Sequence, residues 1–176
     1  MKKELKQDLV TALGVAMVCV GIIGAIYPLL YELGKAGIAF LFGADLTLFK
    51  VFPWVDILVN VTNVSNVGRV FTCCGGMVLP VIICLAVRPT KLWLSFAMLF
   101  MHLVSLCGII EFMIAVLCCR FNMPVFNQDA FDAYRAMRSV PGATFLCVFL
   151  LCGLLTALLG SANSYEVSSI LNDICD

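Results

Sequence analysis

The chain has 176 residues, of which 62% are hydrophobic and only 12% are charged, and its mean hydropathy is +1.07. Soluble domains carry about 25% charged residues, so this composition excludes a water-soluble globule and predicts a polytopic membrane protein. Eleven basic residues balance eleven acidic ones, which leaves no basic surface for nucleic acid. No linker or low-complexity tract divides the chain, so we expect a single domain over residues 1–176.

The first predicted span covers residues 9–33 and follows a short charged cap that lacks the pattern of a cleaved signal peptide. Pro28 lies near the far end of this span, where a kink is expected. Gly21 and Ala25 stand four residues apart, the spacing at which a second helix backbone approaches closely in lipid. We therefore expect this face to pack against another helix.

The long connection at residues 34–68 is too charged to span a membrane and too apolar to be fully hydrated. Aromatic and charged side chains are mixed along its first part, so we expect that part to lie in the headgroup layer. Asn60 and Asn63 each begin an N-glycosylation pattern, which is short and often occurs by chance. Either asparagine is an acceptor only if the loop faces a lumen.

Residues 69–87 and 92–119 form the second and third predicted spans, joined by a polar turn at residues 88–91 as an antiparallel pair. A helix of about 28 residues is about 42 Å long, so the third span exceeds the ~30 Å hydrocarbon core and must tilt or protrude. In the loop at residues 120–139, Phe131, Tyr134 and Met137 recur every three residues, which predicts a short surface helix.

The fourth predicted span covers residues 140–161 and has a small-residue face suited to helix packing, at Gly153, Ala157 and Gly160. In the tail at residues 162–176, apolar residues recur with helical spacing at Val167, Ile170, Leu171 and Ile174. We expect a separate amphipathic helix there, capped by Asn163, that docks on the bundle, on the membrane surface or on a partner.

Four spans place both termini on one side of the membrane. That side carries Lys and Arg more densely in its short segments, so we expect cytoplasmic termini, or matrix-facing termini in an organelle. The expected fold class is all-α: an integral membrane four-helix bundle with four transmembrane helices, an interfacial first loop and a short amphipathic C-terminal helix.

Glu111 is the residue most difficult to place, because a carboxylate at membrane depth must be protonated, paired or exposed to water. Counting outward from the 88–91 turn brings Glu111 level with Arg69, so we predict an ion pair near the membrane boundary. An ion or proton pathway through Glu111 is the alternative. His102 falls on the opposite helix face from Glu111, and we expect it to be a hydrogen-bonded interior or interfacial residue.

Ten cysteines would suggest a disulfide scaffold in a secreted chain, but all except Cys175 lie within or at the ends of apolar spans, where cysteine packs as a small hydrophobe. The sequence contains no Cys-x-x-Cys pair, zinc-binding helix, Walker loop or Gly-x-Ser-x-Gly motif. A single histidine provides neither bis-His haem ligation nor a metal-ligand set. We therefore predict no enzymatic activity, no cofactor and no metal.

Two short patterns resemble known tetraspan families. Cys73-Cys74-Gly75 resembles the CCG motif of tetraspanins, which carry it in a large loop between spans three and four, whereas here it begins the second span. Trp54 followed by paired cysteines resembles claudins, whose loop disulfide and flanking tryptophan pattern are missing here. We assign no family from these patterns.

The leading functional hypothesis is a non-enzymatic multi-pass membrane subunit that packs into, and helps assemble or stabilise, a larger membrane protein complex. One alternative is a pore- or transporter-forming oligomeric subunit. Another is a claudin- or tetraspan-like surface contact protein that uses the loop around Asn60 and Asn63. The expected partners are the lipid bilayer and other membrane protein subunits, with no nucleic acid and no small-molecule substrate.

Overall fold

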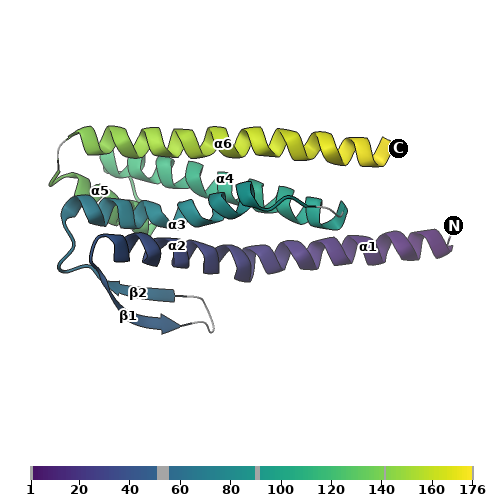
Figure 1. The fold of residues 1–176 in the computed structure, drawn as a ribbon, viewed down its shortest axis with the longest axis horizontal. Helices are drawn as coiled ribbons and strands as arrows, with labels where there is room; N and C mark the ends of the chain where they lie inside the picture. The colour runs from purple at the N-terminus through teal and green to yellow at the C-terminus, as the bar shows by residue number, and fades with distance from the viewer. Residues whose placement is uncertain (1, 51–55, 90–91, 141, 176) are drawn as a thin grey trace.

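The computed structural model describes residues 2–50, 56–89, 92–140 and 142–175. Four helical segments are long and apolar enough to cross a membrane: Val10–Leu41, Asn66–Ala86, Trp93–Arg120 and Thr144–Ser164. They lie side by side, with both termini at one end and a β-hairpin and a short helix near the other (Figure 1). We call these the terminus end and the hairpin end. The four apolar spans expected from the sequence are confirmed, and they fit a multi-pass membrane protein.

The first span is one long helical element rather than the shorter helix predicted at residues 9–33. α1 (Lys2–Gly21) passes through a π-helical turn, η1 (Ile22–Ile26), into α2 (Tyr27–Leu41). The π turn closes on the bond from Tyr27 N–H to Ile22 O, directly before Pro28, whose ring cannot donate. The prediction ended too early because the charged residues near position 33 indicate an exit from lipid, whereas in the structure they find partners and the helix continues.

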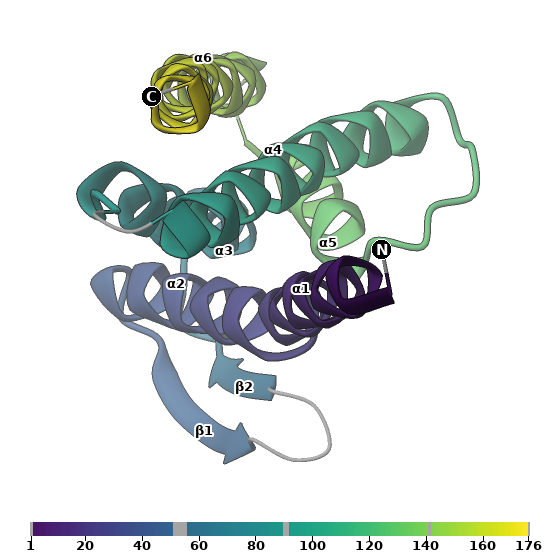
Figure 2. The ribbon, with the colours of Figure 1, turned by 90° about the vertical axis from the view of Figure 1, so that its right-hand side faces the viewer.

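A β-hairpin occupies much of the region that was expected to lie flat in the headgroup layer. β1 (Asp45–Lys50) pairs antiparallel with β2 (Asp56–Asn60), and one extra residue, Thr47, forms a bulge in β1. The hairpin folds back along α2, with β1 on its outer side (Figures 1 and 2). The all-α class is thus corrected to four helical spans with a two-stranded sheet. The predicted interfacial residue Trp54 lies outside the described residues.

The side-chain pattern of β2 explains why this segment is a strand. Ile57 is buried and Val59 is partly buried, whereas Leu58 and Asn60 are exposed. This alternation has the period of two that a half-buried strand requires. The charged residues nearby hid the alternation at the sequence level, because they made the whole connection look interfacial.

α3 (Asn66–Ala86) and α4 (Leu92–Arg120) are the second and third spans, within three residues of their predicted bounds. Ser65 starts α3: its hydroxyl accepts the N–H of Gly68 at 3.1 Å, which is an N-cap. α5 (Gln128–Met137) is the short helix expected between spans three and four. Its buried face carries small residues, including Ala130 and Ala133, whereas Phe131 is exposed.

α6 (Gly142–Cys175) joins the fourth span and the tail in one helix. The separate tail helix predicted after a cap at Asn163 is therefore corrected to an extension of the fourth span. The reason is that residues 161–175 contain neither Pro nor Gly, so nothing stops the helix.

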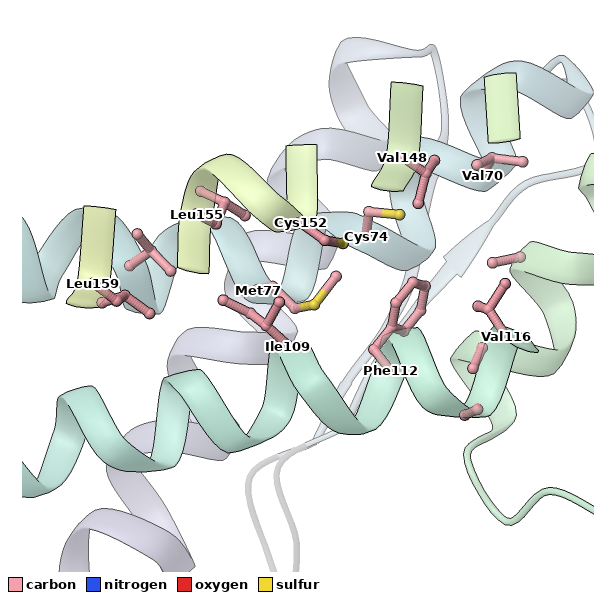
Figure 3. Close-up of a cluster of buried hydrophobic side chains, with 14 of the residues drawn as sticks. Val70, Cys74, Met77, Ile109, Phe112, Val116, Val148, Cys152, Leu155 and Leu159 are labelled. Carbon is pink, nitrogen blue, oxygen red and sulfur yellow. The ribbon is translucent and has the colours of Figure 1, made fainter. Parts of the chain in front are cut away.

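The core lies where α3, α4 and α6 meet (Figure 3). Its largest fully buried side chains include Phe112 and Ile109 of α4 and Met77 of α3. Cys74 and Cys152 are buried in the same cluster and have free thiols. These two cysteines therefore act as small packing residues.

α2 and α3 approach each other through glycines. A methyl group on Gly34 would lie 2.6 Å from the carbonyl oxygen of Gly75, and one on Gly75 would lie 2.7 Å from Ile38 Cβ. Only glycine permits this backbone approach, since a Cβ atom would force the two helices apart. A third contact of this kind places the Tyr31 ring against Gly76.

The small-residue faces expected to pack against another helix have open space beside them in the described part of this chain, so their role in packing stays a prediction. Among the described residues, no atom outside the local helix backbone would lie within 4 Å of a methyl group on Gly21, Gly153 or Gly160, and Ala25 and Ala157 are exposed. Glycine spacing shows where helices can approach, but the complementary surface decides where they do.

Candidate functional site: the polar layer at the hairpin end

Charged side chains of α2 and α5 meet near the hairpin end. Lys35 Nζ lies 3.2 Å from Asp129 Oδ1 and 3.4 Å from Glu32 Oε1. Tyr31 donates its hydroxyl proton to Asp129 Oδ2 at 2.9 Å. The three charged side chains are 16–21% exposed, so water screens them only partly and each partner is costly to remove. We call these four residues the charge cluster.

The charge cluster also holds the hairpin. Glu32 Oε2 accepts the backbone N–H of Ile57 in β2 at 3.4 Å. Glu32 lies nine residues before the end of α2 at Leu41, which is about 14 Å along a helix. One carboxylate therefore ties the hairpin to the side of α2 and keeps it folded back along the helix.

A cavity of about 630 Å³ lies beside the charge cluster, between the hairpin, the start of α3 and α5. Its lining includes three cations and two anions: Lys35, Arg69, Arg135, Asp129 and Asp132. The volume falls within the range of small-ligand pockets, about 300–1,000 Å³, but those pockets are lined mainly by apolar side chains. Most of the lining residues here carry polar or charged side chains, so water can occupy the cavity.

Arg69 stabilises a turn. Its Nε donates to the carbonyl oxygen of Val64 at 3.2 Å, and its Nη2 donates to that of Thr62 at 3.3 Å. Both carbonyls belong to the connection between β2 and α3. Val64 packs against Ala39 and Ala44 below it, so this turn is held from both sides.

Glu111 and Arg69 do not form the predicted ion pair. The two Glu111 oxygens accept from Asn127 Nδ2 at 2.9 and 2.8 Å, and the Glu111 side chain is exposed. Asn127 Oδ1 in turn accepts the N–H of Ala130 at 2.9 Å and caps α5. Counting residues set the height of Glu111 along α4 but not its direction around the helix axis. The contact holds the loop between α4 and α5 against α4.

His102 lies inside the bundle and is 1% exposed. Its Nε2 is 3.2 Å from the carbonyl oxygen of Cys84, so it links α4 to the end of α3. Ser105, one turn further along α4, lies 3.9 Å from Cys84 Sγ through its hydroxyl. These contacts lie toward the terminus end and are separate from the charge cluster near the hairpin end.

The remaining predicted site residues lie on the surface or outside the described side chains. Asn60, the last residue of β2, and Asn63, in the connection that follows, are both exposed, and Asn60 Oδ1 accepts the Thr62 hydroxyl at 2.7 Å. Val167 is exposed on α6. The side chains of the other predicted tail-docking residues, Ile170, Leu171 and Ile174, lie outside the described part of the structure.

The sequence reasoning missed the charge cluster and Asn127. Part of a signal was present, because Glu32 and Lys35 stand three residues apart and Tyr31 and Lys35 four apart on one helix face. Their partner Asp129 is 94 residues from Lys35 along the chain, a pairing that no local pattern can predict. Asn127 carried the usual sign of a helix start, an Asn directly before a polar turn.

Among the residues that the structure describes, no three His, Cys, Asp or Glu side chains form a group that could hold a metal ion. The charge cluster, Arg69 and the Glu111–Asn127 pair each bond to neighbouring side chains or to backbone atoms. Their arrangement is suited to fastening α2, α4, α5 and the hairpin together. No protein-family model, curated protein or solved structure matches the chain.

Proposed function

We propose that this protein is a non-enzymatic multi-pass membrane subunit that packs into a larger membrane complex and helps to assemble or stabilise it. The observation that carries this proposal is the poor packing of the first span. Only 6% of the residues in an 18-residue apolar stretch of this span are buried, compared with 56% for the corresponding stretch of α3. A span that its own bundle leaves uncovered offers its surface to lipid or to another subunit.

The character of the uncovered surface favours another subunit. Gly14, Gly21 and Gly24 of the first span all have open space where a Cβ atom would lie. In lipid, apolar contact alone gives little drive for association, and close backbone approach at small residues provides much of it. α6 is also poorly covered: 22% of the residues in its 18-residue apolar stretch are buried, and Gly153 and Gly160 have open space beside them.

The polar groups support assembly over transport. A conduit would need polar side chains that face water along the membrane depth. In the described part of the chain, Lys35 and Asp129 pair with each other, and Glu111 is held by Asn127. These groups therefore serve to fasten elements together, and the pore-forming alternative has less support.

A surface contact role is the second candidate function, and the hairpin favours it. Both strands project from the side of the bundle, and Leu46, Phe49 and Leu58 are exposed on them. This role requires the hairpin end to face the lumen or the cell exterior, with the termini in the cytoplasm. A glycosidase-sensitive gel shift that N60Q, N63Q or the double variant abolishes would support that orientation.

Blue-native gels of gently solubilised membranes test the main proposal. The wild-type protein should run in a species much larger than its own 19.2 kDa chain with bound detergent. G21L/G24L should shift it toward the free chain, because leucine blocks close approach of a partner helix. M17L changes an exposed residue of the same helix without adding bulk and should leave the large species intact. A wild-type protein that runs only as a free monomer would overturn the proposal.

A further inference from the structure

β1 is an open sheet edge. All six of its residues are exposed, while the neighbouring strand β2 is held against α2 through Ile57. Figure 2 shows β1 on the side of the hairpin away from the helices. The outer edge of such a strand presents unpaired backbone N–H and C=O groups to any strand that can reach it.

The pairing with β2 shows which β1 side chains share a face. Leu46 lies opposite Val59, and Phe49 lies opposite Ile57. Val59 and Ile57 are two residues apart and point to the same side, toward α2, so Leu46 and Phe49 do as well. Residues three apart in a regular strand would point to opposite faces, and the extra residue Thr47 is what brings these two to the same face.

The pairing with β2 also shows which face the two end residues of β1 occupy. Asp45 lies opposite Asn60, and Lys50 lies opposite Asp56, so Asp45 and Lys50 share the other face. The strand is therefore nearly symmetric about its centre. Each end has a charged residue on one face, followed by a large apolar residue on the other face: Asp45 then Leu46 from one end, and Lys50 then Phe49 from the other.

This symmetry makes β1 complementary to itself. If two β1 strands pair antiparallel about a two-fold axis, Asp45 lies opposite Lys50 of the second copy, and the reverse pair forms as well. Leu46 then lies opposite Phe49 of the second copy. Directly opposed residues of opposite charge, and opposed apolar residues, are the pairs that stabilise a sheet.

We propose that β1 pairs antiparallel with β1 of a second copy of this chain, which joins two hairpins into one four-stranded sheet. Such an interface is isologous and closes at a dimer. It would cover Leu46 and Phe49, whose side chains are 51% and 52% exposed. The inference deepens the proposed function by naming one partner, the chain itself, and the surface that it uses.

The position of the hairpin adds a second reason for pairing. The bond from Ile57 to Glu32 anchors the hairpin about 14 Å below the end of α2, along an element of the first span. This anchor holds the open backbone groups of β1 in one place, which lowers the conformational entropy lost when a second strand pairs with them. Pairing β1 with a second strand satisfies those groups.

Cysteine crosslinking tests the register. In L46C/F49C, each new cysteine faces its opposite in the second copy, and mild copper-phenanthroline oxidation should give a dimer band that dithiothreitol removes. L46C/L48C is the matched control: it also adds two cysteines, but Leu48 lies opposite Leu58 and so shares the face of Asp45. If L46C/F49C crosslinks no faster than L46C/L48C or the wild-type protein, the inference is overturned.

A charge-swap cycle tests the complementarity in gently solubilised protein. D45K places two like-charged pairs across the interface and should weaken the dimer about three- to tenfold. K50D should weaken it similarly, although it also opposes Asp56 within the hairpin. D45K/K50D restores opposite charges between copies and should recover most of the affinity. A double variant no better than its singles overturns the proposed pairing.

The two proposals fail in different ways. If crosslinking and the charge-swap cycle fail while the wild-type protein still runs in a large species, the β1 interface is overturned and the assembly role stands. If the crosslink forms but nothing larger than a dimer of this chain is found, the interface stands and the larger complex is overturned.

Discussion

The two halves of the first span, α1 and α2, are both helical, yet they pack differently. α2 packs closely on α3, with Gly34 against Gly75, whereas a methyl group added at Gly14 or Gly21 of α1 would meet no described atom of another element within 4 Å. The difference coincides with the π turn at Ile22–Ile26. It shows that glycine permits close approach without determining where approach occurs.

Polar contacts explain why α2 packs more closely against its neighbours than α1 does. α2 carries Tyr31, Glu32 and Lys35, which hold α5 and the hairpin against it. The described part of α1 beyond residue 9 carries no ionisable group except Cys19. In lipid, apolar side chains gain little by leaving the bilayer for another helix, so specific polar and backbone contacts decide which half of the span packs.

The largest expected effect comes from adding the same side chain to the two halves. G34L should lower the free energy of unfolding by about 3 kcal/mol, because even its Cβ would overlap the Gly75 carbonyl. G21L should change it by less than about 0.5 kcal/mol. Unfolding in mixed SDS micelles, followed by circular dichroism, measures both. Equal losses would contradict the contrast between α1 and α2.

Removing Asp129 should give the next largest effect. D129A leaves the Tyr31 hydroxyl without its acceptor and Lys35 with only Glu32, at an expected cost of about 2 kcal/mol. D132A is the control on the same helix: Asp132 is exposed and, in the described part of the chain, accepts from Gln128, so its loss should stay below about 0.5 kcal/mol. The same micelle titration compares them, and similar losses would show that the cluster does not fasten α5.

Asn127 should follow, since it caps α5 and also holds Glu111. N127A should cost about 1–2 kcal/mol through the lost cap and the two lost bonds to the carboxylate. Hydrogen exchange should show faster opening of α5, while α6 exchanges as before. Q128A, at the next and exposed position, should leave α5 exchange unchanged, and a matching rate in both variants would argue against the cap.

The smallest effect concerns one hydroxyl at each end of the bundle. S65A removes the cap of α3 and should cost about 1 kcal/mol. S164A removes an exposed hydroxyl that donates to Gly160 O within its own helix, so it should be neutral or slightly stabilising, because alanine is the better helix former. Thermal unfolding in detergent ranks the two, and a larger loss in S164A would reverse the expected order.

Much of the span layout could be predicted, whereas the contacts between elements could not. α3 and α4 appeared near their predicted bounds because unbroken apolar runs with polar ends are a local property of the chain. The Glu111–Arg69 pair was predicted from height alone and did not form, because rotation about the helix axis depends on tertiary packing. The hairpin was missed because its alternation covers few residues among many charges.

Composition and hydropathy alone determined that this chain has four membrane-length helices, because the cost of exposing apolar side chains to water accumulates over each run of sequence. Only the tertiary structure decided which glycines contact a neighbouring helix, that Lys35 pairs with Asp129, and that β1 has an open edge. Those outcomes depend on directions and distances between segments far apart in the chain, and no local pattern contains that information.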